Sequence, residues 1–449
     1  MIRRTSALVR AMLDLVRRGN LRGFIAMAEK AEPADVGEVL SALDEKERIQ
    51  AVEAMPRHLS AAALVEMPDE AQAEETFAAL PPEAAVEIVE ELPDDDAADL
   101  VGGLEPEDRR RILAELETTE RTTVEQLLQY DPETAGGLMT RQVVTVLDTA
   151  TAGEAIESLR RQAEAVEDFT TVYVVDAARR LRGVLPLKRL VTSPAERPVR
   201  ELMEEPAARV APEEDQEEVA RVISHYNLPS VPVVDAAGTL LGQVTFDDVI
   251  DVVEEEQTED ILKFGGVSGD EELAGRWTDA VKSRLPWLTV NLATAFLAGA
   301  VAASFQDRIS RHLGLVFWMP VIAGMGGNAG TQALAVTVRR LALGLIPPGR
   351  FLRTVGKELA VGCINGLAMG AIAALVSQFL GQGPRLGLVV TASMIGNLFI
   401  AGFAGAFVPM FLERIGVDPA VASSVFVTTF TDVCGFLLLF GLTGWMLGV

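Results

Sequence analysis

The sequence predicts a multidomain chain that combines α, α/β and membrane α parts: a helical N-terminal domain, a tandem α/β repeat, an acidic connecting helix and five transmembrane helices. Three observations predict this fold class. Prolines recur every 12 or 13 residues near the N-terminus, a different repeat fills the middle of the chain, and five apolar runs complete it. Because each pattern has its own period, each predicts a separate folding unit.

Charge is divided unevenly along the 449 residues. The chain has 39 Lys and Arg against 65 Asp and Glu, a net charge of −26, although 49% of its residues are hydrophobic. Residues 285–449 hold nine of the basic and five of the acidic residues, so the first 284 residues carry a net charge of −30. This division excludes a simple soluble enzyme, and the acidic part offers no surface for nucleic acid.

The first repeat predicts short helices that begin at regularly spaced prolines. These are Pro56, Pro68, Pro81, Pro93 and Pro106, and each of the last four is followed within two residues by an acidic side chain. Proline and acidic side chains both suit the first turn of a helix. We expect the helices to stack as an α-solenoid over residues 21–129, inside an N-terminal domain of residues 1–134.

The second repeat occupies residues 138–260 and predicts two copies of one α/β unit. Val174-Val175-Asp176-Ala177-Ala178 recurs as Val233-Val234-Asp235-Ala236-Ala237, and Gly183 recurs as Gly242. Each copy is expected to run strand, helix, strand, turn, strand and helix, with strands 171–175 and 183–185 in one and 230–234 and 242–245 in the other. We place the copies at residues 135–200 and 201–246, with an insertion near residues 164–168 in the first.

These copies resemble a tandem pair of cystathionine-β-synthase (CBS) domains. In that family a Ser/Thr-x-x-Asp element can contact a nucleotide ribose, and Thr245 with Asp248 fits it. The corresponding residues of the first copy, Pro186 and Arg189, do not fit. The resemblance therefore implies ATP as a candidate ligand at one site of the pair.

An acidic segment follows, and we expect it to form a connecting helix and linker over residues 247–283. Its carboxylates are Asp247, Asp248, Asp251, Glu254, Glu255, Glu256, Glu259 and Asp260. Neighbouring like charges on one helix face cost ~0.2–0.5 kcal/mol per pair in an isolated helix. Bound cations would offset this repulsion, whereas a solvated acidic helix is the alternative.

Five apolar runs are each long enough to cross a hydrocarbon core ~30 Å thick, which takes ~20 helical residues. They are residues 285–305, 313–338, 359–380, 386–412 and 420–449, within a pore domain of residues 284–449. An odd number puts the C-terminus outside if the acidic half, which lacks an export signal, stays in the cytoplasm. The loop between the second and third runs carries Arg339, Arg340, Arg350, Arg353 and Lys357, in agreement with the positive-inside rule.

Asp432 is an ionisable residue within the last apolar run. A carboxylate at this depth costs several kcal/mol and usually lines a polar pathway or has a partner. It lies 12 residues after Ala420, or ~18 Å along a helix, which is near mid-membrane. Cation binding is one interpretation, and a protonated acid hydrogen-bonded to a neighbouring helix is the other.

Residues 324–332 of the second run are rich in glycine and begin four residues after Pro320. Such a segment predicts a weakened helix with exposed carbonyls in a polar pathway, whereas small-residue helix packing is the alternative. The Asn328 amide would add an oxygen ligand for a hydrated ion. Carboxylate and amide oxygens suit Mg²⁺, Mn²⁺ or Ca²⁺, and two chains about a two-fold axis would supply two carboxylates.

The order of these parts resembles the MgtE family of magnesium channels and transporters over nearly the whole chain. The most specific matches are residues 135–139, 320–332, 416–419 and 431–433. The resemblance implies a non-enzymatic homodimer in the bilayer of the cytoplasmic membrane, with Mg²⁺ as substrate and regulator. It also implies a pore at the dimer interface, lined by Asp432 and Asn328, and a connecting helix that acts as a plug.

The same resemblance implies that intracellular Mg²⁺, bound between the N-terminal domain, the CBS pair and the plug, holds the channel closed. By motif position it implicates Asp95, Asp99, Gly136, Asp215, Asp248, Asp251, Glu256, Glu259 and Asp260, with Asp418 near the cytoplasmic mouth. Asn227 lies where an acidic ligand is expected, which predicts a weaker sensor at that point.

Two other classes of function stay open on the sequence. A CBS-regulated transporter of an anion or organic solute would favour a basic substrate site, and the apolar runs contain none. A membrane-anchored nucleotide sensor would not need Asp432. The sequence does not separate Mg²⁺ from Co²⁺, Mn²⁺ or Ca²⁺, nor a channel from coupled transport.

Overall fold

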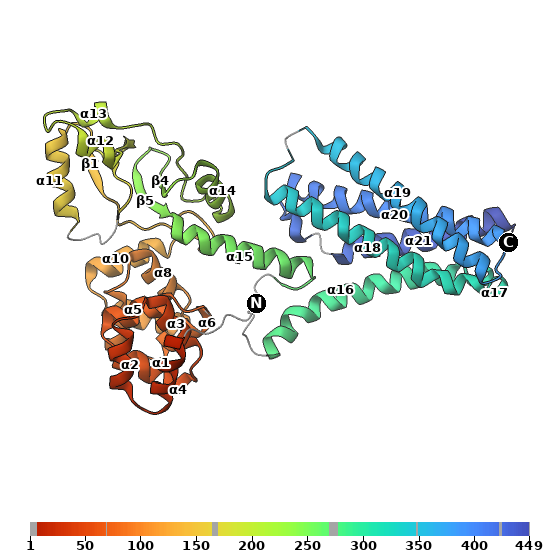
Figure 1. Ribbon diagram of the computed structural model, residues 1–449, viewed down its shortest axis with the longest axis horizontal. Helices are drawn as coiled ribbons and strands as arrows, with labels where there is room; N and C mark the ends of the chain where they lie inside the picture. The colour runs from red at the N-terminus through yellow and green to blue at the C-terminus, as the bar shows by residue number, and fades with distance from the viewer. Residues whose placement is uncertain are drawn as a thin grey trace. The chain divides into compact units, whose positions relative to one another are not determined.

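A computed structural model describes residues 7–68, 70–163, 169–268, 277–346, 349–421 and 424–448. These residues form two compact units, 1–255 and 256–449, and helix α15 (Phe246–Phe264) continues from the first into the second (Figure 1). The insertion expected at residues 164–168 and most of the linker after α15 lie outside the described residues.

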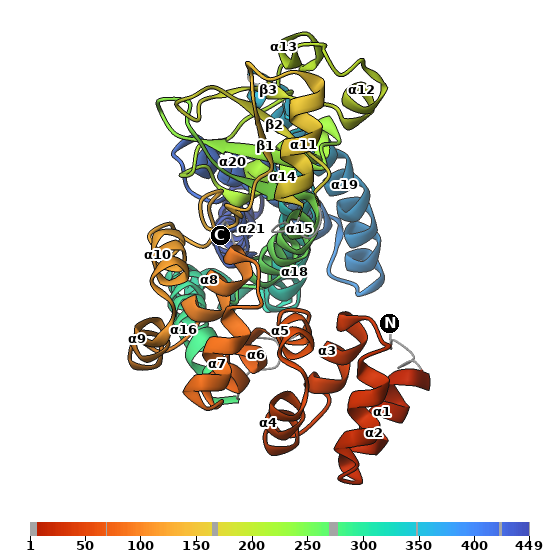
Figure 2. The same cartoon turned by 90° about the vertical axis from the view of Figure 1, so that its left-hand side faces the viewer.

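The first ten helices form a two-layered solenoid (Figure 2). They are α1 (Ala7–Arg17), α2 (Leu21–Ala28), α3 (Pro33–Ser41), α4 (Glu45–Ala54), α5 (Arg57–Val65), α6 (Glu70–Ala78), α7 (Pro82–Val89), α8 (Asp94–Gly102), α9 (Pro106–Glu115) and α10 (Thr118–Leu127). Odd-numbered helices pack in the series α3, α5, α7, α9, and even-numbered helices in the series α2, α4, α6, α8, α10. The predicted solenoid therefore begins one helix earlier than residue 21.

Proline spacing marks the helix starts for a local reason. Pro56, Pro81 and Pro93 are the N-cap residues of α5, α7 and α8, and Pro106 is the first residue of α9. At these positions the missing N–H costs nothing, because the first N–H groups of a helix have no intrahelical acceptor. The acidic residues that follow Pro81, Pro93 and Pro106 lie in the first turn of α7, α8 and α9, where the helix dipole favours negative charge.

The α/β repeat forms two small sheets. The first copy contains β1 (Thr145–Leu147), α11 (Ala152–Gln162), β2 (Tyr173–Val175), β3 (Leu181–Val184), α12 (Leu187–Thr192) and α13 (Val199–Leu202); the second contains α14 (Gln216–Tyr226), β4 (Ser230–Val234) and β5 (Leu240–Thr245). Strand β2 pairs parallel with β1 and antiparallel with β3, and β4 pairs antiparallel with β5. The strand expected at the start of the second copy is reduced to one bridge, Val210 with Val233.

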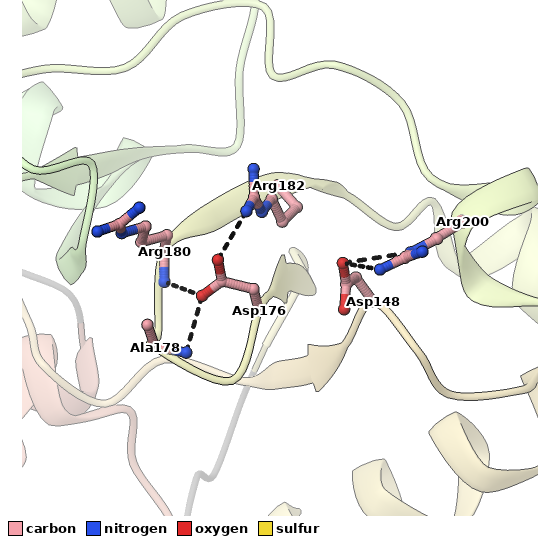
Figure 3. Close-up of polar contacts among 6 residues, drawn as sticks. All are labelled: Asp148, Asp176, Ala178, Arg180, Arg182 and Arg200. Carbon is pink, nitrogen blue, oxygen red and sulfur yellow. Dashed lines mark hydrogen bonds and ion pairs between the residues drawn. The ribbon is translucent and has the colours of Figure 1, made fainter.

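The repeated Val-Val-Asp-Ala-Ala motif builds the same turn twice. The Oδ1 atom of Asp176 accepts hydrogen bonds from Ala178 N at 2.8 Å and Arg180 N at 3.0 Å (Figure 3). Asp235 Oδ1 accepts in the same way from Ala237 N at 2.8 Å and Thr239 N at 2.7 Å. These backbone hydrogen bonds lower the pKa of both carboxyl groups. The motif is therefore a structural turn signal.

Two ion pairs in the first copy fix the ends of its strands. Arg182 binds the second oxygen of Asp176 at 2.8 Å, across the turn between β2 and β3 (Figure 3). Arg200 of α13 binds Asp148, the residue after β1, at 2.7 Å (Figure 3). Between the copies, the buried hydroxyl groups of Tyr173 and Ser230 lie 2.9 Å apart. The two copies are thus joined by buried polar as well as apolar contacts.

The second unit contains the apolar helices. They are α16 (Trp277–Ser304), α17 (Gln306–Arg311), α18 (Gly314–Ala342), α19 (Phe351–Phe379), α20 (Pro384–Arg414), the short 3₁₀ helix η1 (Pro419–Val421) and α21 (Ser424–Leu447). Helix α20 packs against α18, α19 and α21, whereas α16 packs on α21 (Figure 1). Within the described residues, four helices are long and apolar enough to cross a membrane: α16, α19, α20 and α21.

Two expectations about this unit are corrected: the weakened helix of the second run and the start of the last run. Residues 324–332 do not break the second run, because α18 is one continuous helix of 29 residues. Helix α18 is long enough to span a bilayer, but it is not apolar enough to be one of those four helices. Helix α21 begins at Ser424 rather than Ala420, so Asp432 lies ~12 Å along it, about one third of the way from its start.

Candidate functional site

Carboxylates from two elements of the first unit meet near the start of α8 and the start of α15. Asp95 is 9% exposed, and its Oδ1 atom has no hydrogen-bond partner in the described structure. Burial raises the pKa of Asp95 well above its usual value, and the charges of Asp96, Asp248 and Asp94 act in the same direction. Burial and the nearby charges of Asp248 and Glu66 raise the pKa of Asp96 to about 7. This cluster holds protons more tightly than separate carboxylates would.

Asp94 connects the solenoid to the segment that leads into the repeats. Its carboxylate accepts a hydrogen bond from the Thr140 hydroxyl at 2.6 Å and from Arg141 N at 3.1 Å. Thr140 in turn exchanges backbone hydrogen bonds of 2.9 Å with Gln243 on β5. The start of α8 is thereby held next to the second copy, where α15 begins.

Asp248 has a local partner that bears on both of its expected roles. Its Oδ2 accepts hydrogen bonds from the Thr245 hydroxyl and from Thr245 N at 3.2 Å, an arrangement that caps the start of α15. Burial raises the pKa of Asp248 even though the Thr245 hydrogen bond opposes it. Because it also faces Asp95 and Asp96, Asp248 belongs to the carboxylate cluster as well as to the Thr-x-x-Asp element.

The other expected residues of the first unit fall at two places. Asp99 lies one helical turn after Asp95 on α8, and Asp251 lies one turn after Asp248 on α15. Gly136 N instead donates to Pro212 O at 2.9 Å, and Asp215 caps α14 by accepting from Glu217 N at 2.9 Å. A Cβ at Gly136 would lie 2.5 Å from the Tyr130 ring, so only glycine fits there. Gly136 and Asp215 thus belong to the junction of residues 134–136 with 212–216.

The described carboxylates do not form a preorganised metal cage. Among the residues that the structure describes, no group of three or more Asp, Glu, His or Cys side chains is arranged to hold a metal ion. The proximity of Asp95, Asp96 and Asp248 is instead evident in their raised pKa values. Such a cluster can be neutralised by protons or cations, and cation binding would require its side chains to move together.

In the second unit, the end of α15 carries a charge network around Lys263. Its ammonium lies 2.7 Å from Asp418 Oδ2 and also contacts Glu259, one turn earlier. Burial lowers the pKa of Lys263, but its hydrogen bonds to Asp418 and Glu259 outweigh this, so the pKa is raised overall. Burial and the charge of Asp418 raise the pKa of Asp260, which Lys263 and Arg339 oppose. Glu256 lies one turn before Asp260 on the same helix.

The glycines of α18 form a seam against α20 and α21. A Cβ at Gly326 would lie 2.2 Å from Asn397 Nδ2, and one at Gly330 would lie 2.4 Å from Val427 Cγ1. Asn397 of α20 is fully buried, and its Nδ2 donates to Ile322 O at 2.9 Å. Its Oδ1 is buried without a hydrogen-bond partner in the described structure. These glycines serve helix packing, the alternative interpretation of the sequence.

Asn328 faces away from this seam. It is exposed on α18, and Gly324 and Gln332, four residues before and after it, are partly or fully exposed as well. Asp432 on α21 is partly exposed, and its carboxylate forms no hydrogen bond or ion pair with another described residue. Within one chain the structure therefore leaves a polar face on α18 exposed and a carboxylate on α21 partly exposed, both in helices of the apolar unit.

Four residues of these sites were missed by the sequence analysis: Asp94, Asp96, Lys263 and Asn397. Asp94 and Asp96 carried a signal, since they flank Asp95 in the first turn of α8. Lys263 follows Glu259 by four residues, a spacing that favours an ion pair on a helix. Its contact with Asp418, and the contact of Asn397 with Ile322, depend on tertiary packing.

Comparison with known proteins identifies the family of this chain. The profile for MgtE, described as a divalent cation transporter, matches residues 319–442, the MgtE intracellular N domain matches residues 31–133, and CBS domains match residues 135–196 and 199–255. The Magnesium transporter MgtE of Thermus thermophilus is 34% identical over 332 residues, which are 73% of each chain. The chain belongs to the MgtE family. The family and its relatives are transporters rather than enzymes.

Other MgtE proteins match over the same extent or over the first unit. The Magnesium transporter MgtE of Bacillus subtilis is 31% identical over 330 residues, 74% of this chain and 73% of the relative. A crystal structure of the cytosolic domain of the Mg²⁺ channel MgtE in complex with ATP is 34% identical, covers 54% of this chain and 99% of that one, and has a TM-score of 0.51. The soluble part of a magnesium transporter also matches, at 28% identity, 56% and 99% coverage and a TM-score of 0.51. The resemblance to the MgtE family is thus confirmed.

Proposed function

We propose that this protein is a Mg²⁺ channel or transporter for magnesium uptake across the cytoplasmic membrane, and that intracellular Mg²⁺ closes it. The uncovered polar face of α18 carries the proposal. Exposed Asn328 would meet hydrocarbon if lipid surrounded α18, and polar groups without partners are costly there. The face is better explained as the wall of a hydrated pathway, with Asp432 as its carboxylate. A hydrated Mg²⁺ suits such oxygen ligands, since it keeps several of its waters.

A homodimer supplies the other wall of this pathway. Only 6% of the apolar stretch of α16 is buried within the chain, so most of the surface of this helix is available to lipid or to a second copy. One carboxylate per chain is little charge for a divalent ion, and two chains about a two-fold axis bring two Asp432 side chains to the same height. The pore then lies at the dimer interface.

Five crossings complete the proposed topology, with α18 as the fifth membrane helix beside α16, α19, α20 and α21. A helix whose polar face lines water need not be as apolar as its neighbours. The N-terminal domains are then cytoplasmic and the C-terminus is outside. The basic loop between α18 and α19 lies on the cytoplasmic side, as the positive-inside rule requires.

Regulation is proposed to act through the two carboxylate clusters. Mg²⁺ at Asp95, Asp96 and Asp248 would replace the protons that these residues bind and stabilise the contact between solenoid and second repeat, with Asp99 and Asp251 as further ligands. Gly136 and Asp215 would contribute ligands separately, at the junction of residues 134–136 with 212–216. Mg²⁺ near Glu256, Glu259, Asp260 and Asp418 would hold the end of α15. Since both clusters use carboxylates of one helix, cation binding favours one position of α15. We propose that this position closes the pore.

ATP at the CBS pair is a further proposal, supported by a related cytosolic domain that was solved with ATP. Thr245 and Asp248 are the candidate ribose contacts, and they are hydrogen-bonded to each other. A nucleotide would have to exchange this bond for its own. The shared use of Asp248 predicts that ATP and Mg²⁺ influence each other's binding.

Uptake into proteoliposomes tests the transport proposal. The full chain should admit Mg²⁺, Asp432→Ala should abolish or strongly reduce the flux, and Asp432→Asn should retain part of it if the ion is held through its waters. Asp307→Ala, which removes an exposed carboxylate from α17, is the matched control. Wild-type flux in Asp432→Ala would reject the pathway. Flux of an anion or organic solute instead, or of no solute, would favour the two alternative classes.

A further inference from the structure

A basic pocket lies where α18 ends and α19 begins. Its volume is about 380 Å³, and it is lined by Arg340, Leu345, Arg350, Arg353, Thr354 and Lys357. Arg340 belongs to the last turn of α18, Arg350 is the N-cap residue of α19, and Lys357 lies one turn after Arg353. Four cationic side chains thus meet in one pocket of a chain whose net charge is −26.

The positive charge of this pocket is poorly compensated. Lys357 lies 3.4 Å from Glu358, whose side chain is 8% exposed, and this is the one ion pair that the lining residues form with a described residue. The start of α19 adds the positive end of its helix dipole. Arginine forks near a helix N-terminus are suited to phosphate.

Arg340 supplies an independent sign that an acceptor is missing. Its Nη1 atom is buried and has no hydrogen-bond partner in the part of the chain that the structure describes. A buried donor without an acceptor is destabilising, so native structures rarely keep one. An anion in the pocket would provide the acceptor.

The surroundings of the pocket indicate which anion it takes. It lies at the start of α19, one of the helices apolar enough to span a membrane. Leu345 lines the pocket at 58% exposure, and Leu343 and Leu352, which are near lining residues in the sequence, are 51% and 82% exposed. A soluble phosphate compound would gain nothing from these leucines, whereas a lipid would cover them with its acyl chains. Basic pockets between membrane helices on the cytoplasmic side suit anionic headgroups.

We propose that this pocket binds the phosphate of an anionic phospholipid, with Arg340, Arg350 and Arg353 on the headgroup and the exposed leucines against the acyl chains. The lipid would occupy the leaflet that faces the basic loop. It would tie the end of α18, the helix that carries Asn328, to the start of α19.

Lipid retention by the full chain in detergent tests this site. The protein is titrated with phosphatidylglycerol or with phosphatidylcholine of the same acyl chains, and bound lipid is counted by native mass spectrometry. We expect phosphatidylglycerol to be retained more strongly. Arg350→Gln with Arg353→Gln should weaken its retention about fivefold for each charge removed. Arg311→Gln with Arg385→Gln, which removes two exposed arginines from the end of α17 and the start of α20, should not.

Further variants and a competitor distinguish a lipid site from non-specific lipid retention and from a site for free phosphate. Arg350→Lys with Arg353→Lys keeps the charge and should keep most of the binding, so this pair reports on the site even if the Gln pair fails to fold. Equal retention of phosphatidylcholine would overturn the proposal, because the site would then not read headgroup charge. Displacement of the lipid by inorganic phosphate, or unchanged retention in the folded Gln pair, would overturn it as well.

Discussion

The ammonium of Lys263 lies 2.7 Å from Asp418 Oδ2, although 155 residues separate the two in sequence. The other oxygen of Asp418 accepts a hydrogen bond from Ala420 N at 2.7 Å, which fixes the carboxylate at the start of η1. Beside this pair, Phe264 packs with Leu334 and Val427, from α18 and α21. The end of α15 is thereby attached to helices that we propose to line the pore.

The first prediction concerns this attachment. Lys263→Met removes a partner of a partly buried ion pair, whose loss should cost between the ~1 kcal/mol of exposed pairs and the ~3 kcal/mol of buried ones. At low Mg²⁺ we expect residues 256–264 to exchange amide hydrogens roughly tenfold faster than in the wild type. At high Mg²⁺ a bound cation should replace the lysine charge and restore slow exchange.

Lys188→Met is the control for Lys263→Met, because Lys188 is a lysine of the first repeat copy, outside the second unit. It should leave exchange at residues 256–264 unchanged. Equal exchange in Lys263→Met and wild type at low Mg²⁺ would show that the lysine does not hold this helix end.

The second prediction concerns pH. Burial raises the pKa of Asp96 to about 7, against ~4 for a free aspartate. The contact between the start of α8 and the start of α15 therefore binds a proton that is released when these two helices separate. Stability of the contact should therefore fall as pH rises from about 4 to about 7, and it should stay low above that range. Mg²⁺ should protect the first unit from protease more strongly at pH 8 than at pH 6.

Asp96→Asn should flatten this pH dependence, because the amide cannot ionise. Glu196→Gln removes an exposed carboxylate of the first copy and should keep the wild-type profile. If the Mg²⁺ protection of the wild type is the same at pH 6 and pH 8, protons and Mg²⁺ do not compete at this cluster.

The third prediction concerns Asn397. Asn397→Ala removes the hydrogen bond to Ile322 O and should lower stability by about 1 kcal/mol, typical of interhelical hydrogen bonds in membranes. It should also reduce Mg²⁺ flux, since it loosens α18 beside the seam. Thr391→Val removes a hydrogen bond of 2.9 Å to Gly370 O, between α20 and α19, and should lower stability similarly without affecting flux. Equal flux in Asn397→Ala and wild type would remove Asn397 from the positioning of the pathway.

The architecture could be predicted because its signals are local. Four of the five prolines of the first repeat lie at helix starts that the structure describes, and the duplicated Asp176 and Asp235 each build a turn from the four residues that follow. Apolar runs of membrane length likewise need no knowledge of their neighbours. These features follow from short stretches of sequence, so a single sequence was enough to place them.

The missed features depend on which elements meet. Glycines at residues 324–332 predicted a weakened helix, because glycine destabilises an isolated one. In the structure they allow α18 to approach α20 and α21 closely, and close packing against these two helices keeps α18 continuous. The seam could have been recognised from small residues on α20 such as Gly405, but their register with α18 is a property of the packed helices.

The last prediction tests that seam at Gly405. A Cβ added there would lie 2.6 Å from Gly330 O and 2.7 Å from Ala333 Cβ, too close for α20 to stay in place. Gly405→Ala should force the two helices apart and lower stability by about 1–3 kcal/mol, as overpacked substitutions do.

Gly299→Ala on α16 is the matched control, because no heavy atom lies within 4 Å of its Cβ position. There the higher helix propensity of alanine should leave stability equal or slightly greater. Thermal unfolding of the two variants in one detergent measures the difference, and equal midpoints would show that α18 and α20 can separate without cost. Because Gly405→Ala changes no charge, a fall in its Mg²⁺ flux would report only the displacement of α18, and with it of Asn328.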